Sequence, residues 1–175
     1  MRDKKVLFIT QAAMIAALYV VLTLLANALG LANYAVQIRF SEALTILPFF
    51  TAAGIPGLTI GCLLSNLLTG CMPLDIVFGS LATLLGAVGT YLLRKYYWLA
   101  PIPPIAANTF IVPFILAYVY QFEGSIPYFM LTVGIGEILS CGVLGMILLG
   151  VLMRYRNVIF KTQSPGEKHM RVLKK

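Results

Sequence analysis

Charged side chains are scarce in this sequence. Asp, Glu, Lys and Arg make up only 11% of its 175 residues, whereas soluble domains carry about 25%. Hydrophobic residues account for 60% of the chain, so water would be a poor solvent for most of its surface. The composition predicts a membrane protein.

Residues that support catalysis or bind metals are also few. The single histidine is His169, near the C-terminus, and Cys62, Cys71 and Cys141 form neither a Cys-x-x-Cys pair nor an even disulfide set. No Gly-x-x-x-x-Gly-Lys-Ser/Thr phosphate loop occurs in the sequence, so the chain has no ATPase motif of that class. We expect no metal, no cofactor and no enzymatic activity.

A net charge of +7 would also suit a nucleic-acid-binding protein. The Lys and Arg residues instead gather near the two chain ends and at Arg94-Lys95, and only Arg39 lies elsewhere. This distribution is typical of membrane proteins, whose basic residues stay on the cytoplasmic side. We therefore expect contact with membrane lipid and none with nucleic acid.

The apolar runs predict an all-α, polytopic membrane protein with six helices. A spanning helix needs about 20 mostly apolar residues, and the expected helices cover residues 5–29, 42–53, 56–70, 75–95, 104–121 and 127–154. A single kinked span in place of the second and third helices would move one basic terminus outside. Six spans keep both termini and twelve of the thirteen basic residues cytoplasmic, with Arg39 outside.

The expected domain organisation is one transmembrane domain, residues 1–156, followed by a basic, flexible cytoplasmic tail, residues 157–175. The first apolar stretch is about 20 residues long, beyond the roughly 7–15 of a signal peptide core. We therefore expect it to be the first helix and not a cleaved leader.

Polar residues within the apolar runs predict a binding site. Glu137 lies some ten residues into the last expected helix, where an acidic residue costs roughly 2.5–3.5 kcal/mol at the bilayer centre. It should therefore face a cavity or a partner. Arg39, Glu42, Asn66 and Asp75 fall in the same outer half of the bundle. Simpler alternatives are an interfacial ion pair of Arg39 with Glu42, and Asp75 as a helix N-cap.

Two further patterns favour interaction. Residues Val36 to Phe40 alternate between apolar and polar, as an extended segment does, which would put Gln37 and Arg39 on one face of a lid over the site. The first helix carries two ridges of small residues, Ala12 with Ala16 and Ala13 with Ala17. Such ridges let another helix approach closely, either inside the bundle or in a partner subunit.

Three strings carry a family resemblance: Val36-Gln37-Ile38-Arg39-Phe40-Ser41-Glu42-Ala43-Leu44, Gly61-Cys62-Leu63-Leu64-Ser65-Asn66 and Leu74-Asp75-Ile76-Val77-Phe78-Gly79-Ser80. Together with Gly136-Glu137, they resemble the QueT family of queuosine-precursor transporters, from about Gln11 to Gly150. The resemblance implies a six-helix S component, the substrate-binding subunit of an energy-coupling-factor (ECF) importer, in a prokaryotic cell membrane. Its partners would be a T component and two ATPase subunits.

The resemblance also implies the substrate, queuine or another 7-deazaguanine such as 7-aminomethyl-7-deazaguanine. The expected binding residues are Gln37, Arg39, Glu42, Asn66, Asp75 and Glu137. We hypothesise that Glu137 binds the base edge and that Asp75 or Glu42 binds the amine, while the others contact carbonyl, ring nitrogen or diol. Ala12, Ala13, Ala16 and Ala17 would dock on the T component.

Two other functions compete with this one. A self-sufficient, proton-coupled secondary transporter would use Glu137 as its coupling carboxylate, although the sequence shows no convincing inverted repeat. A purely structural assembly subunit would explain the ridges of small residues but would leave the outer polar residues without a role.

Overall fold

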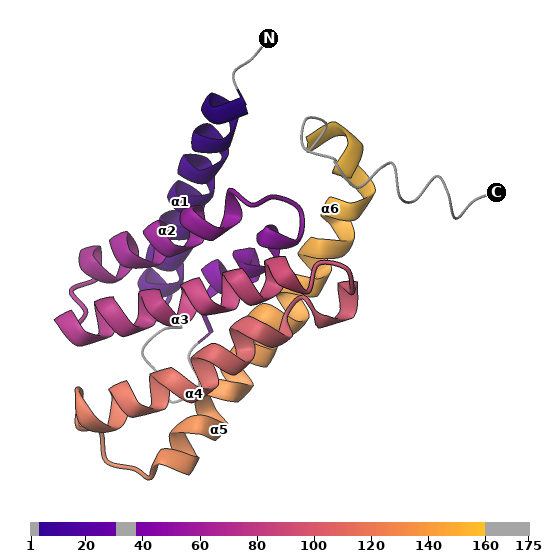
Figure 1. Ribbon diagram of the computed structural model, residues 1–175. Coiled ribbons are helices and arrows are strands. Elements are labelled where there is room, and N and C mark those ends of the chain that lie inside the picture. The colour runs from indigo at the N-terminus through magenta and orange to yellow at the C-terminus, as the bar shows by residue number, and fades with distance from the viewer. Residues whose placement is uncertain (1–3, 31–37, 160–175) are drawn as a thin grey trace.

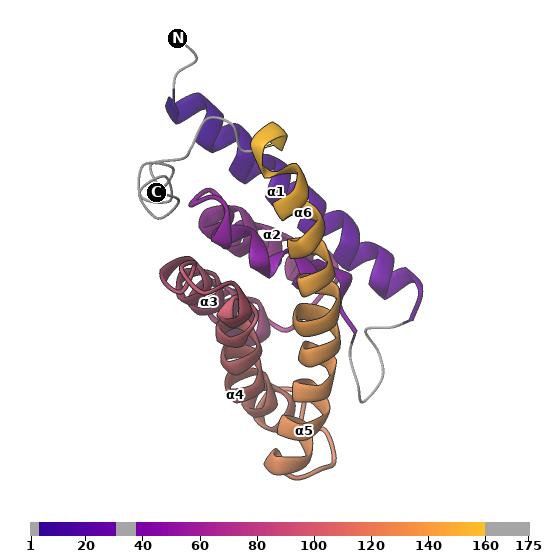
Figure 2. The same cartoon turned by 90° about the vertical axis from the view of Figure 1, so that its right-hand side faces the viewer.

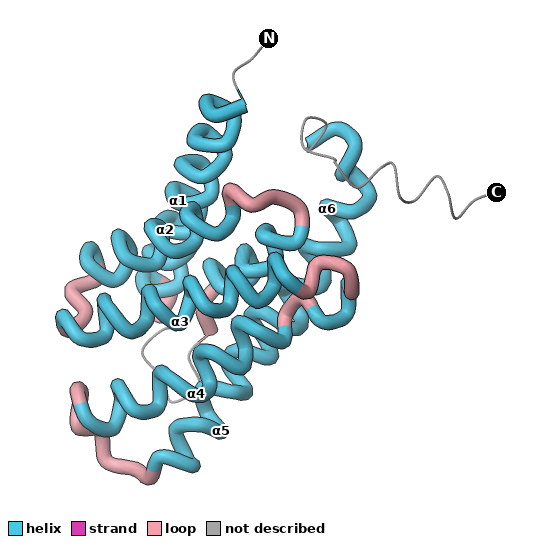
Figure 3. Tube along the Cα trace, viewed as in Figure 1, coloured by secondary structure: helices cyan, strands magenta, loops and turns pink. Residues whose placement is uncertain are grey.

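The computed structural model describes residues 4–30 and 38–159, and every regular element in this part of the chain is a helix (Figures 1 and 3). The all-α prediction is confirmed. The predicted tail lies almost entirely outside the described residues, and so does Gln37. The helices are α1 (Lys4–Ala28), η1 (Phe40–Phe49), α2 (Gly54–Leu68), α3 (Pro73–Leu92), η2 (Tyr97–Leu99), α4 (Ile102–Tyr118), α5 (Ile126–Glu137), η3 (Ile138–Leu144) and α6 (Gly145–Ile159).

Four helical stretches are long and apolar enough to cross a membrane: Lys4–Ala28, Pro73–Leu92, Tyr97–Tyr118 and Ile126–Arg156. Only 22% to 39% of the most apolar 18-residue window of each stretch is buried inside the bundle, and many large apolar side chains are exposed. Such an apolar exterior suits lipid and not water. The chain is therefore a membrane protein.

The two remaining helices, η1 and α2, are separate elements and not one kinked helix. Residues 50–53 lie between them, and Gly54 packs so closely on Pro48 that a Cβ there would lie 2.8 Å from the Pro48 nitrogen. At about 2.0 Å per residue η1 is roughly 20 Å long, and α2 is roughly 22 Å long at 1.5 Å per residue. Both are shorter than the roughly 30 Å hydrocarbon core.

Helices α1 and α2 pack through small residues. A Cβ at Gly57 would lie 2.8 Å from the carbonyl oxygen of Ala12, and a Cβ at Gly61 would lie 3.1 Å from that of Ala16. The ridge of Ala12 and Ala16 is thus used inside the bundle. The other ridge, Ala13 and Ala17, is exposed.

Two helices of unusual type meet in the interior. Helix η1 is a 3-10 helix of ten residues with Pro48 inside it, and η3 is a π-helix that continues α5 into α6 as one rod (Figure 2). The two contact each other. Long 3-10 segments and π-turns are uncommon and often occur at functional sites.

The beginning of α1 and the end of α6 lie at the same end of the bundle, as Figures 1 and 2 both show. This arrangement is compatible with the expected placement of both termini on one side of the membrane. The number of spans and the orientation remain predictions.

Candidate functional site

A cavity of about 580 Å³, hereafter the wide cavity, opens among the end of α1, the end of α2, the start of α3, the end of α4 and the start of α5. Its volume lies within the roughly 300–1,000 Å³ typical of small-molecule sites. Both apolar or aromatic and polar side chains line it. The polar lining comprises Thr23, Asn27, Arg39, Asn66, Thr69, Cys71, Asp75, Tyr120, Glu123, Tyr128 and Thr132.

A second space of about 20 Å³, the inner compartment, adjoins the wide cavity, because Arg39, Asp75 and Val112 line both. It has room for about one water-sized group. Its other lining residues are Glu42, Cys62, Gly79, Thr83, Asn108, Val133 and Glu137. The binding region thus has a wide part that suits a small organic molecule and a narrow acidic part beyond it.

Glu42 reaches the inner compartment from η1 and is only 2% exposed. The hydroxyl of Tyr19, on α1, donates a hydrogen bond to its Oε1 atom, and Thr45 donates to its main-chain oxygen at 2.6 Å. Its Oε2 atom has no hydrogen-bond partner among the described residues. Since buried polar atoms are nearly always paired, this oxygen is an acceptor available to a ligand.

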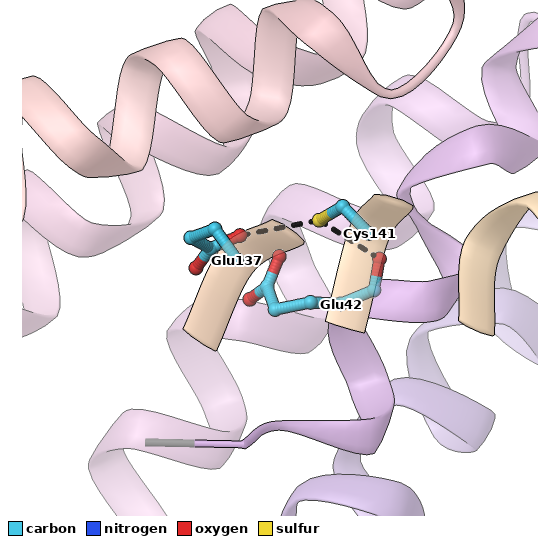
Figure 4. A group of neighbouring side chains, drawn as sticks. All are labelled: Glu42, Glu137 and Cys141. Carbon is cyan, nitrogen blue, oxygen red and sulfur yellow. Dashed lines mark hydrogen bonds between the residues drawn. The ribbon is translucent and has the colours of Figure 1, made fainter. Parts of the chain in front are cut away.

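Glu137 ends α5 and is 9% exposed. The amide of Asn108, on α4, donates to its Oε1 atom at 3.0 Å, and the thiol of Cys141 donates to its Oε2 atom at 3.2 Å. The same thiol lies 3.4 Å from the main-chain oxygen of Glu42. Figure 4 shows that Cys141 bridges the segments that carry the two carboxylates.

Asp75 is not the N-cap that was considered for it. Pro73 begins α3, so Met72 is the N-cap residue and makes no side-chain capping bond. The Asp75 side chain turns instead to the loop after α4, where its Oδ2 atom accepts a hydrogen bond from Tyr120 Oη at 2.8 Å. Partial burial and this bond raise the pKa of Tyr120 above its usual value, so the tyrosine remains a donor.

Asn66 and Arg39 are the two remaining predicted residues that line the wide cavity. Asn66 is 3% exposed, and a Cβ at Gly79 would lie 3.1 Å from its amide nitrogen and 3.4 Å from Asp75 Oδ1. Gly79 therefore leaves room for both side chains.

Arg39 has the expected extended backbone, and its N–H donates to Ser140 Oγ at 3.2 Å. The extended segment is shorter than expected, because η1 already begins at Phe40.

Five of the six residues predicted for the site line these two adjoining spaces: Arg39, Glu42, Asn66, Asp75 and Glu137. The sixth, Gln37, lies outside the described residues. Sequence reasoning missed Cys141 and Tyr120. Cys141 follows Glu137 by about one helical turn, which could have suggested it, whereas nothing in the sequence pairs Tyr120 with Asp75.

A metal ion is the other ligand to consider. Donor atoms of Glu42, Glu137 and Cys141 all lie within 4.8 Å of one another (Figure 4). Two carboxylates and a thiolate are a set that Zn²⁺ accepts. Here, however, both Glu137 oxygens already accept hydrogen bonds, one from the Asn108 amide and one from the Cys141 thiol. The expectation that the chain holds no metal stays a prediction.

The fold and this site define an all-helical membrane protein with a cavity lined by polar and apolar side chains at one end of its bundle. The family model described as QueT transporter matches residues 9–154, and the chain belongs to this family. The predicted resemblance is thereby confirmed.

A curated relative, the queuosine precursor transporter QueT of Lactococcus lactis subsp. cremoris, is 34% identical over 103 residues. The match covers 56% of this chain and 60% of the relative, less than two thirds of the relative's length. No solved structure matches the chain.

Proposed function

We propose that this chain captures a queuosine precursor at the outer face of the cell membrane, as the S component of an ECF importer. The observation that carries the proposal is the convergence of Arg39, Glu42, Asn66, Asp75 and Glu137 on two adjoining spaces. Family membership and the name of the relative point to the same substrate class.

The chemistry of a 7-deazaguanine matches the site. A carboxylate accepts hydrogen bonds from the N–H and amino groups of a guanine-like edge, and an acidic side chain binds a protonated amine by a charge-assisted bond. Glu42, Asp75 and Glu137 supply these acceptors jointly. Arg39 and Asn66 supply donors for the carbonyl oxygen, a ring nitrogen or a diol.

Six spans with both ends in the cytoplasm form part of the proposal. The described basic residues away from the site, such as Lys4, Lys5, Arg94 and Lys95, would then lie inside, while the wide cavity would open outward. Because the sequence has no phosphate loop, ATP hydrolysis would take place in two partner subunits. The T component would dock on α1, where Ala13 and Ala17 are exposed.

A proton-coupled secondary transporter is the second candidate. The observation that favours it is the burial of Glu42 beside Glu137, because two adjacent buried carboxylates favour holding a shared proton. In that case the chain alone would move the substrate.

Uptake by reconstituted vesicles separates the two functions. Liposomes containing this chain, a T component and both ATPases should accumulate 7-aminomethyl-7-deazaguanine only with ATP, and the chain alone should not. Accumulation by the chain alone, driven by a pH gradient, would establish the secondary transporter and exclude the S-component role.

A further inference from the structure

The carboxylates of this basic protein are concentrated at the candidate site. The sequence has six Asp and Glu residues and a net charge of +7. Four of the six line the wide cavity or the inner compartment: Glu42, Asp75, Glu123 and Glu137. Asp3 and Glu167 lie outside the described residues. In the part of the chain that the structure describes, Arg39 is the one Lys or Arg in the lining.

The charge is most unbalanced in the inner compartment. Glu42, Asp75 and Glu137 line it together with the single guanidinium of Arg39. Burying ionised groups without compensating charge is costly, so this compartment favours a positively charged group.

Size and hydrogen bonding define that group further. The inner compartment takes about one water-sized group, and an ammonium is of that size. Its three N–H donors need acceptors, and Glu42 Oε2 is a buried acceptor with no partner among the described side chains. The bicyclic ring of a deazaguanine does not fit in about 20 Å³ and must lie in the wide cavity.

We propose that the site selects cationic ligands, and that the inner compartment receives the ammonium group of the side arm with Glu42 as its acceptor. The proposal rests on the proposed function and deepens it, because it restricts the substrate to precursors with a basic amine. Glu137 and Asp75 add negative charge around the ammonium group. In this arrangement the edge of the base would be bound by side chains of the wide cavity, such as Asn66, and not by Glu137 as hypothesised from the sequence.

The test compares two ligands that share one ring system, 7-aminomethyl-7-deazaguanine and the neutral 7-cyano-7-deazaguanine. Both are titrated into the full-length, detergent-solubilised protein by calorimetry. A charge-assisted hydrogen bond should make the amine bind about 10-fold tighter or more. Equal affinities would overturn cation selection and leave the proposed function standing, whereas no binding of either would overturn the proposed function itself.

Two variants locate the charge that is recognised. Glu42→Gln should weaken binding of the amine about 10-fold while changing binding of the nitrile little. Arg94→Gln, which removes one charge from an exposed side chain that lines neither space, is the control and should keep the preference. A preference retained in Glu42→Gln would refute the role of Glu42. If thermal melting shows that Glu42→Gln is unfolded, cation selection is tested by the comparison of the two ligands on the unmodified protein.

A metal ion is the other cation with a matching donor set. The titrations are therefore repeated with EDTA and with added Zn²⁺. Ammonium binding predicts the same preference for the amine in both cases. Loss of that preference with EDTA, with recovery on Zn²⁺ addition, would show that the cation is a metal and would overturn the assignment.

Discussion

Glu42 and Glu137 are held in the interior by donors from different helices. Tyr19 on α1 donates to Glu42, and Asn108 on α4 donates to Glu137. These bonds satisfy part of the hydrogen-bonding capacity of each carboxylate, and one Glu42 oxygen is left for a ligand. A buried carboxylate with an unpaired oxygen lowers the stability of the fold. Such a cost is expected for a side chain whose role is to bind a ligand.

Replacing Glu137 with Gln tests the need for its charge. Gln keeps the size of the side chain and one acceptor oxygen, so the fold should survive, while affinity for 7-aminomethyl-7-deazaguanine should fall about 10- to 100-fold. Calorimetry measures the affinity, and thermal melting in detergent checks the fold. Unchanged affinity in a folded variant would remove Glu137 from the site.

The Tyr120 hydroxyl should contribute to stability through its bond to Asp75. Because the folded protein raises the pKa of Tyr120, its stabilising effect should be complete below about pH 10, the usual pKa of tyrosine, and should disappear as the pH rises further. Tyr120→Phe should therefore lower the melting temperature at pH 8. At strongly alkaline pH the melting temperatures of the variant and of the unmodified protein should become equal. A difference that grows with pH would contradict this.

At the scale of single elements, most helices could be predicted from the sequence, because long apolar runs interrupted by Pro, Gly or charge leave little choice in lipid. The 3-10 form of η1 and the π-form of η3 could not, because an apolar run with the periodicity of a helix does not specify which hydrogen-bond pattern the helix adopts. The positions of Glu42 and Glu137 near the site were predictable. Their hydrogen-bond partners were not, since those come from distant parts of the chain.

The packing of α1 on α2 should hold Tyr19 in place for Glu42. A Cβ at Gly61 would lie 2.7 Å from Tyr19 Cβ, so Gly61→Leu should separate the helices and destabilise the protein by about 1–3 kcal/mol, as overpacking does. Ligand binding should weaken as well. Gly150→Leu is the matched control, because a Cβ at this exposed glycine meets nothing within 4 Å. Equal melting temperatures for the two variants would contradict the expected packing role.

At the scale of the whole molecule, the α1 surface that remains outside the bundle is the expected docking site for a T component. Ala13→Leu combined with Ala17→Leu should abolish copurification with the T component while leaving substrate affinity unchanged, because both alanines are exposed and line neither space of the site. Val151→Leu, at an exposed position of α6, is the control. Normal copurification of the double variant would place the docking surface elsewhere.

The architecture as a whole suits capture of a small polar molecule. One end of the bundle has a wide cavity with an acidic inner compartment, and the beginning of α1 and the end of α6 lie at the opposite end. Such an arrangement provides binding at one face, while movement across the membrane would depend on partner subunits or on coupled protons.

The central claim is that this chain binds a deazaguanine by itself, and a ligand titration of the purified protein tests it most directly. Queuine, 7-aminomethyl-7-deazaguanine, guanine and riboflavin are titrated by calorimetry into protein shown to be folded. The account predicts tight binding of at least one amine-bearing deazaguanine, much weaker binding of guanine and none of riboflavin. The absence of binding to every deazaguanine would contradict it.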